Sequence, residues 1–204
     1  MSGRQAYWEN VYATKDEHTV SWFQDKPDVS LDLIRATGVK APASIIDIGG
    51  GTSRLVDALV DEGFAVTVLD LSEKALATSK ARLGAMGAHV KWIVADITTW
   101  EPPQTYDVWH DRAALHFLID PKDRVAYVKR LSRAVRPHGH AIIGTFAPDG
   151  PERCSGLSVV RYDAATIGEL LGHSFEPIES RRHDHQTPAG ATQRFQFSRF
   201  QRIY

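Results

Sequence analysis

The chain has 204 residues, of which 43% are hydrophobic and 24% carry a charged side chain. These proportions are typical of a soluble globular protein, and because the length suits a single domain, we expect no second independent enzyme domain. The 24 basic and 25 acidic side chains leave a formal net charge of -1, which provides no general attraction to nucleic acids or anionic lipids.

Several features argue against secretion and membrane insertion. Cys154 is the only cysteine, so no intramolecular disulfide can form, and the N-terminal residues MSGRQAYWEN lack the apolar core of a signal peptide. No stretch approaches the roughly 18 apolar residues of a membrane span. We therefore expect a cytoplasmic protein, a monomer or homodimer, in which Cys154 is a small apolar residue rather than a reactive thiol.

Residues 1–40 predict a helical cap or lid: the segment Tyr7–Phe23 is rich in aromatic side chains, and Val29–Thr37 predicts a second helix. After it, short apolar runs alternate with segments of helical spacing. The predicted strands are Ser44–Ile48, Ala65–Leu69, Val90–Val94, Tyr106–Trp109 and His140–Phe146. The predicted helices are Arg54–Glu62, Ser72–Met86, Ala113–Phe117, Arg124–Val135 and Ala164–Leu171.

This alternation of strands and helices predicts an α/β fold with a doubly wound, Rossmann-like sheet that is mostly parallel. The last two predicted strands, Phe175–Arg182 and Thr192–Arg202, are joined by a segment without a helix. They predict an antiparallel hairpin that completes a seven-stranded sheet at the C-terminus.

The strongest local signal is the segment SIIDIGGGTSRLVDAL, residues 44–59, in which three glycines separate an apolar strand from a helix. Glycine lets a ligand approach the backbone, and the amides at the start of a helix attract ligand oxygens. Asp70 ends the next strand, where a carboxylate can accept hydrogen bonds from both hydroxyls of a ribose. The two signals together predict a site for a nucleotide or nucleoside.

Two residues indicate which nucleoside. A dinucleotide site needs a small residue where this chain has Arg54, and Asp47, just before the glycines, would repel a pyrophosphate. The same carboxylate can attract an ammonium group, directly or through water. A ligand with a ribose and a cationic amino-acid part therefore fits better, and S-adenosylmethionine has both parts.

In the segments DIGGGTS, VLDLS, VADIT, YDVWHDR and LSRAVRPHGHAIIGTF, the chain resembles the class I S-adenosylmethionine-dependent methyltransferases over nearly its whole length. Its aromatic N-terminal segment and compact length also resemble the thiopurine- and tellurite-resistance-type methyltransferases. The superfamily resemblance implies a methionine site at Asp47, Gly49, Gly50 and Gly51, and a ribose site at Asp70 with Leu71 beside the adenine. It further implies that Asp96 binds the adenine amino group, that Ile97 flanks the ring, and that His110 lies near the sulfonium.

The segment WHDRAALHFL, residues 109–118, supplies the candidate catalytic residues His110, Asp111 and Arg112. His110 could face the substrate or be a wall of the cofactor site without proton transfer. Arg112 could bind an anionic substrate, or it could pair with Asp111 or another carboxylate. His116 is a candidate substrate residue, with hydrogen-bonded packing as its alternative.

Further candidates lie in other segments. The turn-rich segment Thr145–Tyr162 is expected to be a substrate loop, and Tyr12, Trp22 and Phe23 are expected to face it as lid residues or to pack in the core. His183 and His185 lie on one side of a predicted strand, but the sequence offers no third ligand. We therefore expect a solvated hairpin tip and no metal.

These observations predict an S-adenosylmethionine-dependent methyltransferase that methylates a small-molecule acceptor by in-line displacement, at a sulfur, nitrogen, oxygen or metalloid atom. A small acceptor is favoured because the cofactor fold uses almost the whole chain. A protein lysine methyltransferase of the same fold and a non-catalytic S-adenosylmethionine-binding protein are the alternatives. RNA methylation is disfavoured by the balanced charge and because the fourth strand ends in VWHDR rather than in an Asn-Pro-Pro-Tyr type motif.

Overall fold

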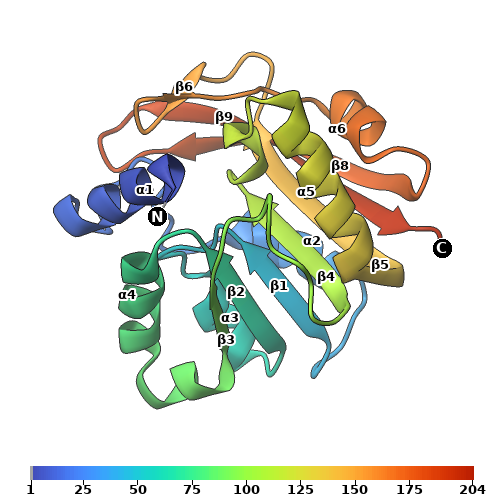
Figure 1. Cartoon of the computed structure of the whole chain (residues 1–204), viewed down its shortest axis with the longest axis horizontal. Coiled ribbons are helices and arrows are strands. Elements are labelled where there is room, and N and C mark those ends of the chain that lie inside the picture. Colours follow the sequence, from blue (N-terminus) through green and yellow to red (C-terminus); the bar gives the residue numbers. More distant parts are fainter. Residues whose placement is uncertain (1) are drawn as a thin grey trace.

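The computed structural model describes residues 2–204 and contains a seven-stranded sheet with helices on both faces (Figure 1). The strand order is β3-β2-β1-β4-β5-β9-β8. Strands β1 to β5 are parallel, whereas β9 is antiparallel to both β5 and β8. This is the Rossmann-like sheet with a C-terminal antiparallel hairpin that the sequence predicts.

The strands of the sheet are β1 (Ser44–Ile48), β2 (Ala65–Asp70), β3 (Lys91–Val94), β4 (Tyr106–Arg112), β5 (Val135–Phe146), β8 (Phe175–Gln186) and β9 (Thr192–Arg202). The α-helices are α1 (Gly3–Thr14), α2 (Asp28–Ala36), α3 (Leu55–Asp61), α4 (Glu73–Leu83), α5 (Pro121–Ala134) and α6 (Ala164–Leu171). Two 3-10 turns, η1 (Gly84–His89) and η2 (Leu115–Phe117), and a small hairpin, β6 (Arg153–Cys154) with β7 (Leu157–Ser158), complete the elements. None of the helices described between residues 2 and 204 has both the length and the apolar character of a membrane span.

Side-chain caps fix where several helices begin. The Ser72 hydroxyl accepts a hydrogen bond from the Ala75 amide at 3.1 Å, so α4 starts directly after β2. Asp163 and Thr166 form a reciprocal capping box at the start of α6. Asp120 caps α5, whose first residue is a proline. These local signals explain why the predicted starts of α4 and α6 lie within one or two residues of the observed ones.

The two faces of the sheet bury separate apolar cores. Helices α5 and α6 cover one face through residues such as Tyr127 and Ile167. Helices α2 and α3 cover the other face through residues such as Leu33 and Leu59. Thus α2 packs in the core, and of residues 1–40 only α1 and the segment after it extend toward the carboxyl ends of the strands (Figure 1). Met1, the first residue of the expected lid, lies outside the described residues.

The structure corrects several predicted elements. The first helix ends at Thr14, so Trp22 and Phe23 lie in an irregular segment rather than in a helix. The helix predicted at Ala113–Phe117 is a single 3-10 turn, because Ala113 adopts a φ of 72° that interrupts helical geometry. Strand β5 begins directly after α5, and β8 continues to Gln186 by pairing with β9. The prediction of a solvated hairpin tip at His185 is therefore wrong, since this side chain is buried within β8.

Candidate active site

Two adjoining cavities lie at the carboxyl ends of β1, β2 and β4, where the strand order reverses. Ligands of open α/β sheets bind at this place because the connections on either side of it leave toward opposite faces. The larger cavity encloses about 770 Å³ and the smaller about 480 Å³, including space open to solvent. Both are lined by Tyr12, Trp22, Gly49 and Arg112.

The three glycines between β1 and α3 are tightly enclosed. Gly49 and Gly51 have positive φ values of 66° and 49°. A Cβ on Gly49 would lie 2.8 Å from the Ala114 Cβ, and one on Gly51 would lie 2.5 Å from the Tyr12 hydroxyl. At Gly50 it would collide with Val68. The turn therefore requires glycine for its backbone and for its space, and it brings the backbone of residues 49–50 to the cavities.

Five of the predicted cofactor residues line the larger cavity together: Gly49, Asp70, Leu71, Asp96 and Ile97. The Asp70 carboxylate accepts a hydrogen bond from the Ser72 amide at 2.8 Å, and its burial raises its pKa to about 7. Asp96 accepts hydrogen bonds from the amide and hydroxyl of Thr98 at 2.9 and 2.7 Å. Its second oxygen lies 3.6 Å from the Arg4 guanidinium, which comes from α1.

Asp47 and His110 lie opposite each other on the neighbouring strands β1 and β4, and both line the smaller cavity. The His110 Nδ1 atom is 2.7 Å from the Asp47 carboxylate, and its Nε2 atom is 2.9 Å from the Ser30 hydroxyl on α2. The side chains of Asp47 and His110 are each only 3% exposed. Because both ring nitrogens are engaged, this geometry favours His110 as a positioning residue for Asp47 over a role as a free base.

Asp111 points to the other face of the sheet, because side chains alternate along a strand. Its carboxylate accepts hydrogen bonds from the Ala114 and Leu115 amides at 2.8 and 3.1 Å and from the Tyr127 hydroxyl at 2.7 Å. Burial raises its pKa to about 6. Asp111 lines neither cavity, and these contacts make it an organiser of the turn after β4.

Arg112 returns to the side of His110 and lines both cavities. Its Nη1 atom donates to the Trp22 carbonyl at 2.9 Å, and its guanidinium carbon lies 4.7 Å from the centre of the Phe195 ring. Its Nε and Nη2 atoms are buried without a hydrogen-bond partner within residues 2–204. The ion pair with Asp111 that the sequence left open is not formed, since Asp111 bonds to Tyr127 and to backbone amides.

His116 lies close to this arginine but lines neither cavity. It is fully buried and makes edge-to-face contacts with Phe117 and Phe146. Burial, reinforced by the charge of Arg112, lowers its pKa to about 3, so the ring is neutral. This environment favours the packing interpretation of His116 over contact with a substrate.

Two other groups named from the sequence have clear environments. Burial raises the pKa of the Cys154 thiol to about 11, and Cys154 contributes to the wall of the larger cavity as a neutral thiol. The Nε2 atom of His185 lies 2.8 Å from the Ser21 carbonyl, and burial lowers its pKa to about 4. Within the described part of the chain, no cluster of three or more histidine, cysteine or acidic residues is arranged to hold a metal ion.

Aromatic side chains cover the cavities. Tyr12 and Trp22 line both, and Phe23 lines the smaller one. Sequence reasoning missed Trp8, which lines the larger cavity and packs edge-to-face against Trp22 and Phe117 at centroid distances of 5.8 and 5.0 Å. The available signal was spacing, because Trp8 and Tyr12 are four residues apart and so lie on one face of α1. We call Trp8, Tyr12, Trp22 and Phe117 the aromatic cover.

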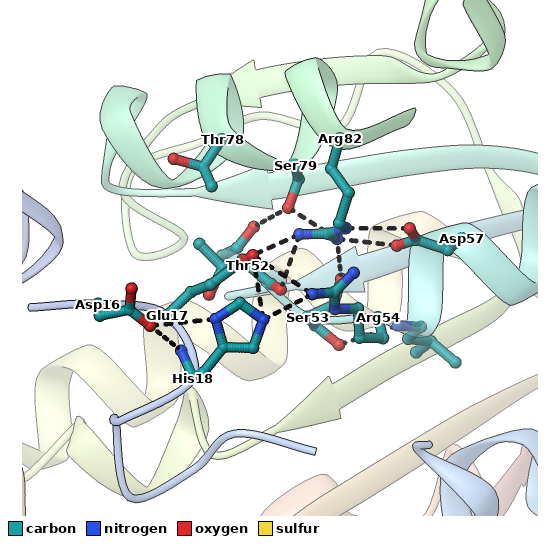
Figure 2. Close-up of polar contacts among 12 residues, drawn as sticks. Asp16, Glu17, His18, Thr52, Ser53, Arg54, Asp57, Thr78, Ser79 and Arg82 are labelled. Carbon is teal, nitrogen blue, oxygen red and sulfur yellow. Dashed lines mark hydrogen bonds and ion pairs between the residues drawn. The ribbon is translucent and has the colours of Figure 1, made fainter. Parts of the chain in front are cut away.

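A polar network fastens the N-terminal segment to the glycine-rich turn (Figure 2). Glu17, between α1 and α2, accepts from Arg54 at 3.3 Å and from Arg82 of α4 at 3.1 Å. Arg82 also donates to the carbonyls of Thr52 and Ser53 and to both carboxylate oxygens of Asp57. We call the interactions of Glu17, Arg54, Arg82 and Asp57 the Glu17 network. It ties the segment that bears Trp8, Tyr12 and Trp22 of the aromatic cover to the loop that borders the smaller cavity.

Comparisons with known proteins agree with this geometry. A family model described as a methyltransferase domain matches residues 45–139. Nodulation protein S of Rhizobium tropici is 22% identical over 129 residues, which are 63% of this chain and 54% of that protein. The chain spans about half the length of the nodulation proteins S that it matches first.

Two solved structures share the fold over nearly the whole chain. One, from work on the conversion of a disulfide bond into a thioacetal group during echinomycin biosynthesis, has a TM-score of 0.77 at 21% identity and covers 98% of this chain and 93% of its own. The other is the 1,6-didemethyltoxoflavin-N1-methyltransferase of Burkholderia thailandensis, with bound 1,6-didemethyltoxoflavin and S-adenosylhomocysteine. Its TM-score is 0.76 at 19% identity, with 98% of this chain and 88% of that chain covered.

The family match covers the glycine-rich turn, the end of β2 and the strand that carries His110 and Arg112. The sheet order, with its C-terminal antiparallel hairpin, is that of a Rossmann-like methyltransferase fold. Residues 45–139 therefore match a methyltransferase domain, and nearly the whole chain shares its fold with a solved methyltransferase that holds S-adenosylhomocysteine.

Proposed function

We propose that this protein transfers the methyl group of S-adenosylmethionine to a small-molecule acceptor. The supporting observation is the pair of adjoining cavities, one bordered by a buried ribose-type carboxylate and the other by a carboxylate beside a glycine turn. When bound, S-adenosylmethionine supplies an electrophilic methyl group on a sulfonium.

The residues fit this cofactor at both ends. The Asp70 carboxylate, which uses one hydrogen bond on the Ser72 amide, has remaining capacity to accept from ribose hydroxyls. Leu71 and Ile97 supply apolar surface for the adenine, with Asp96 beside them. At the other end, Asp47 borders the smaller cavity and attracts the ammonium of the methionine part, while His110 holds the carboxylate in place.

The chain contributes to catalysis mainly by positioning. Methyl transfer requires the acceptor atom to lie in line with the breaking bond, roughly 3–3.5 Å from the methyl carbon, in a site that excludes water. The aromatic cover supplies this enclosure, because its residues Trp8, Tyr12 and Trp22, all in the N-terminal segment, line the cavities. In this proposal His110 acts on Asp47, and Arg112 faces the acceptor.

A small acceptor suits the enclosure of the two cavities. Aromatic side chains of the N-terminal segment, Tyr12 and Trp22, line both of them. The solved methyltransferase from Burkholderia thailandensis contains bound 1,6-didemethyltoxoflavin together with S-adenosylhomocysteine. These two observations favour a small molecule over a protein lysine as the acceptor.

The test compares two acceptor pools. The protein is incubated with S-adenosylmethionine labelled in its methyl group. The acceptor pool is either a small-molecule extract or the proteins of a lysate from which small molecules have been removed. We expect label in a small molecule, and loss of that label with Asp70→Ala but not with Asp61→Ala, an exposed carboxylate on α3. Label confined to protein would support the lysine methyltransferase alternative, and binding without transfer to either pool would support a non-catalytic role.

A further inference from the structure

We propose that the free edge of the Arg112 guanidinium is a subsite for a carboxylate of the methyl acceptor. The inference rests on the proposed function, because it places the acceptor beside the cofactor in the adjoining cavities. It narrows the acceptor to an aromatic or otherwise apolar small molecule that carries an acidic group.

The geometry of the guanidinium supports this assignment. The two atoms without partners, Nε and Nη2, share one edge of the planar group, and their N–H bonds point in nearly the same direction. A carboxylate can accept both hydrogen bonds at once, one on each oxygen. The Trp22 carbonyl and the Phe195 ring hold the opposite side and one face of the guanidinium. The edge is therefore fixed in orientation, and both of its N–H groups lack a hydrogen-bond partner within residues 2–204.

The charges around Arg112 also favour an anionic ligand. The Nε and Nη2 atoms of Arg112 are buried, and none of the ion pairs among residues 2–204 supplies this guanidinium with an anion. The Asp47 carboxylate acts on it only from beyond ion-pair distance. Burial lowers its pKa to about 10, so the guanidinium still carries its charge at neutral pH. The nearby His116 and His185 are neutral and provide no negative charge. An unpaired buried charge is costly, and an anionic ligand at this edge offsets that cost.

The position of Arg112 favours the acceptor as the source of the carboxylate. The residues that hold it are Trp22 of the N-terminal segment and Phe195 of β9, with Cys154 of β6 nearby, and none of the three belongs to the glycine turn. The glycine turn borders the smaller cavity together with Arg112. The aromatic cover borders the larger cavity, so an apolar ring can lie against Trp8 and Phe117 while its carboxylate reaches Arg112. The methionine part of the cofactor also carries a carboxylate, and the experiment separates the two sources.

The experiment uses matched acids and amides on the protein loaded with S-adenosylhomocysteine. The probes are benzoate, salicylate and indole-3-acetate, each paired with its neutral amide, and affinity is measured by calorimetry. Charge-assisted hydrogen bonds lead us to expect that at least one acid binds about tenfold or more tightly than its amide. Equal affinity of acid and amide in all three pairs would overturn the proposal.

Variants identify the residue responsible. Arg112→Met should abolish the preference for acids, Arg112→Lys should keep part of it, and Arg133→Met should leave it unchanged. Arg133 is a matched control because it is an arginine of α5 that pairs with Glu101 and lines neither cavity. Thermal melting checks that the variants fold, and the acids should raise the melting temperature of the wild-type protein but not of folded Arg112→Met.

Affinity for the cofactor product decides between the two carboxylates. If Arg112→Met leaves binding of S-adenosylhomocysteine within about threefold of wild type, the acceptor assignment stands. If Arg112→Met weakens binding of S-adenosylhomocysteine by the same factor as it weakens binding of the acids, Arg112 holds the carboxylate of the cofactor and the proposal is wrong. Failure of the wild-type protein to bind S-adenosylhomocysteine at all would instead refute the proposed function, and with it this inference.

Discussion

At the scale of single residues, the environment of Asp70 makes cofactor binding sensitive to pH. Burial raises the pKa of this carboxyl to about 7, so both protonation states are populated near neutral pH. The ionised form can accept hydrogen bonds from two ribose hydroxyls. Affinity for S-adenosylhomocysteine should therefore fall as the pH drops below 7, approaching about tenfold per pH unit.

Calorimetry across a pH series from about 5.5 to 8 measures this dependence. Asp70→Asn should bind weakly with a nearly flat profile, because the amide does not titrate in this range. The pH profile of wild type should remain in Asp61→Asn, which alters an exposed carboxylate on α3. A wild-type affinity that stays constant over the series would contradict the assignment of Asp70 to the ribose.

Asp111 has a structural environment, and its substitution should affect stability more than turnover. Its carboxylate satisfies two backbone amides and the Tyr127 hydroxyl in a fully buried position. Asp111→Ala leaves these donors without a partner and should lower the free energy of unfolding by about 2–4 kcal/mol. Urea unfolding measures this loss. Turnover per folded molecule should stay within about threefold of wild type.

The control for Asp111 is Asp120→Ala, which removes an exposed helix cap on α5 and should cost only about 1 kcal/mol. A folded, stable Asp111→Ala protein that has lost turnover would restore Asp111 to the catalytic residues.

The sequence predicts the positions and roles of some site residues better than those of others. Asp47, the glycines and Asp70 belong to short strand-to-turn motifs, so their positions relative to one another follow from local geometry. The roles of Asp111 and Arg112 depend on which face of β4 each one occupies, and alternation along that strand was a usable signal. The sequence could not predict how Arg112 is held or that two of its nitrogen atoms lack a hydrogen-bond partner. Its contacts, Trp22 and Phe195, come from distant segments of the chain.

At the scale of elements, the Glu17 network should control release of the cofactor product. Glu17 bridges Arg54 and Arg82 from a segment that must move if the aromatic cover is to open (Figure 2). Glu17→Gln removes the charge from these half-buried contacts. We expect the rate of S-adenosylhomocysteine release to rise by about three- to tenfold, which corresponds to a loss of roughly 0.6–1.4 kcal/mol.

Stopped-flow tryptophan fluorescence measures this rate, since Trp8 and Trp22 border the cavities. Added salt should accelerate release from wild type but have little further effect on Glu17→Gln. Glu62→Gln is a matched control because Glu62 forms an ion pair with Arg35 between α2 and α3, outside both cavities. An unchanged release rate in Glu17→Gln would show that this network does not restrain the cover.

Element prediction succeeded where the signal was local. Alternating apolar runs and helical segments predicted the sheet and its helices, and the observed helices begin at local side-chain caps such as Asp163. The exceptions depend on contacts between distant segments. Apolar spacing at Ala113–Phe117 imitates a helix, but Ala113 adopts a positive φ of 72° and its amide donates to the Gly144 carbonyl of β5 at 2.8 Å. The polar end of β8 is a strand because β9 supplies its hydrogen bonds.

At the scale of the whole molecule, the site joins segments that are far apart in the chain. Tyr7 of α1 donates to the Ser155 carbonyl, and Arg4 contacts both Asp96 and Asp123. The N-terminal helix is thereby attached to the loop after β5 and to the start of α5. A ligand that fills the cavities should stabilise these long-range contacts together with the sheet.

This architecture predicts where ligand binding will slow local opening. S-adenosylhomocysteine at about 100 times its Kd should raise the free energy of unfolding by about 2.7 kcal/mol. Hydrogen exchange measured by mass spectrometry should slow in residues 3–23 as well as in the glycine turn, because the N-terminal segment forms the cover. The β8–β9 turn at residues 187–191 lines neither cavity, and it serves as the internal control. Protection from hydrogen exchange in residues 3–23 requires that this segment forms ordered contacts over the ligand. If the ligand raises the free energy of unfolding but does not slow exchange there, it binds while the cover is open.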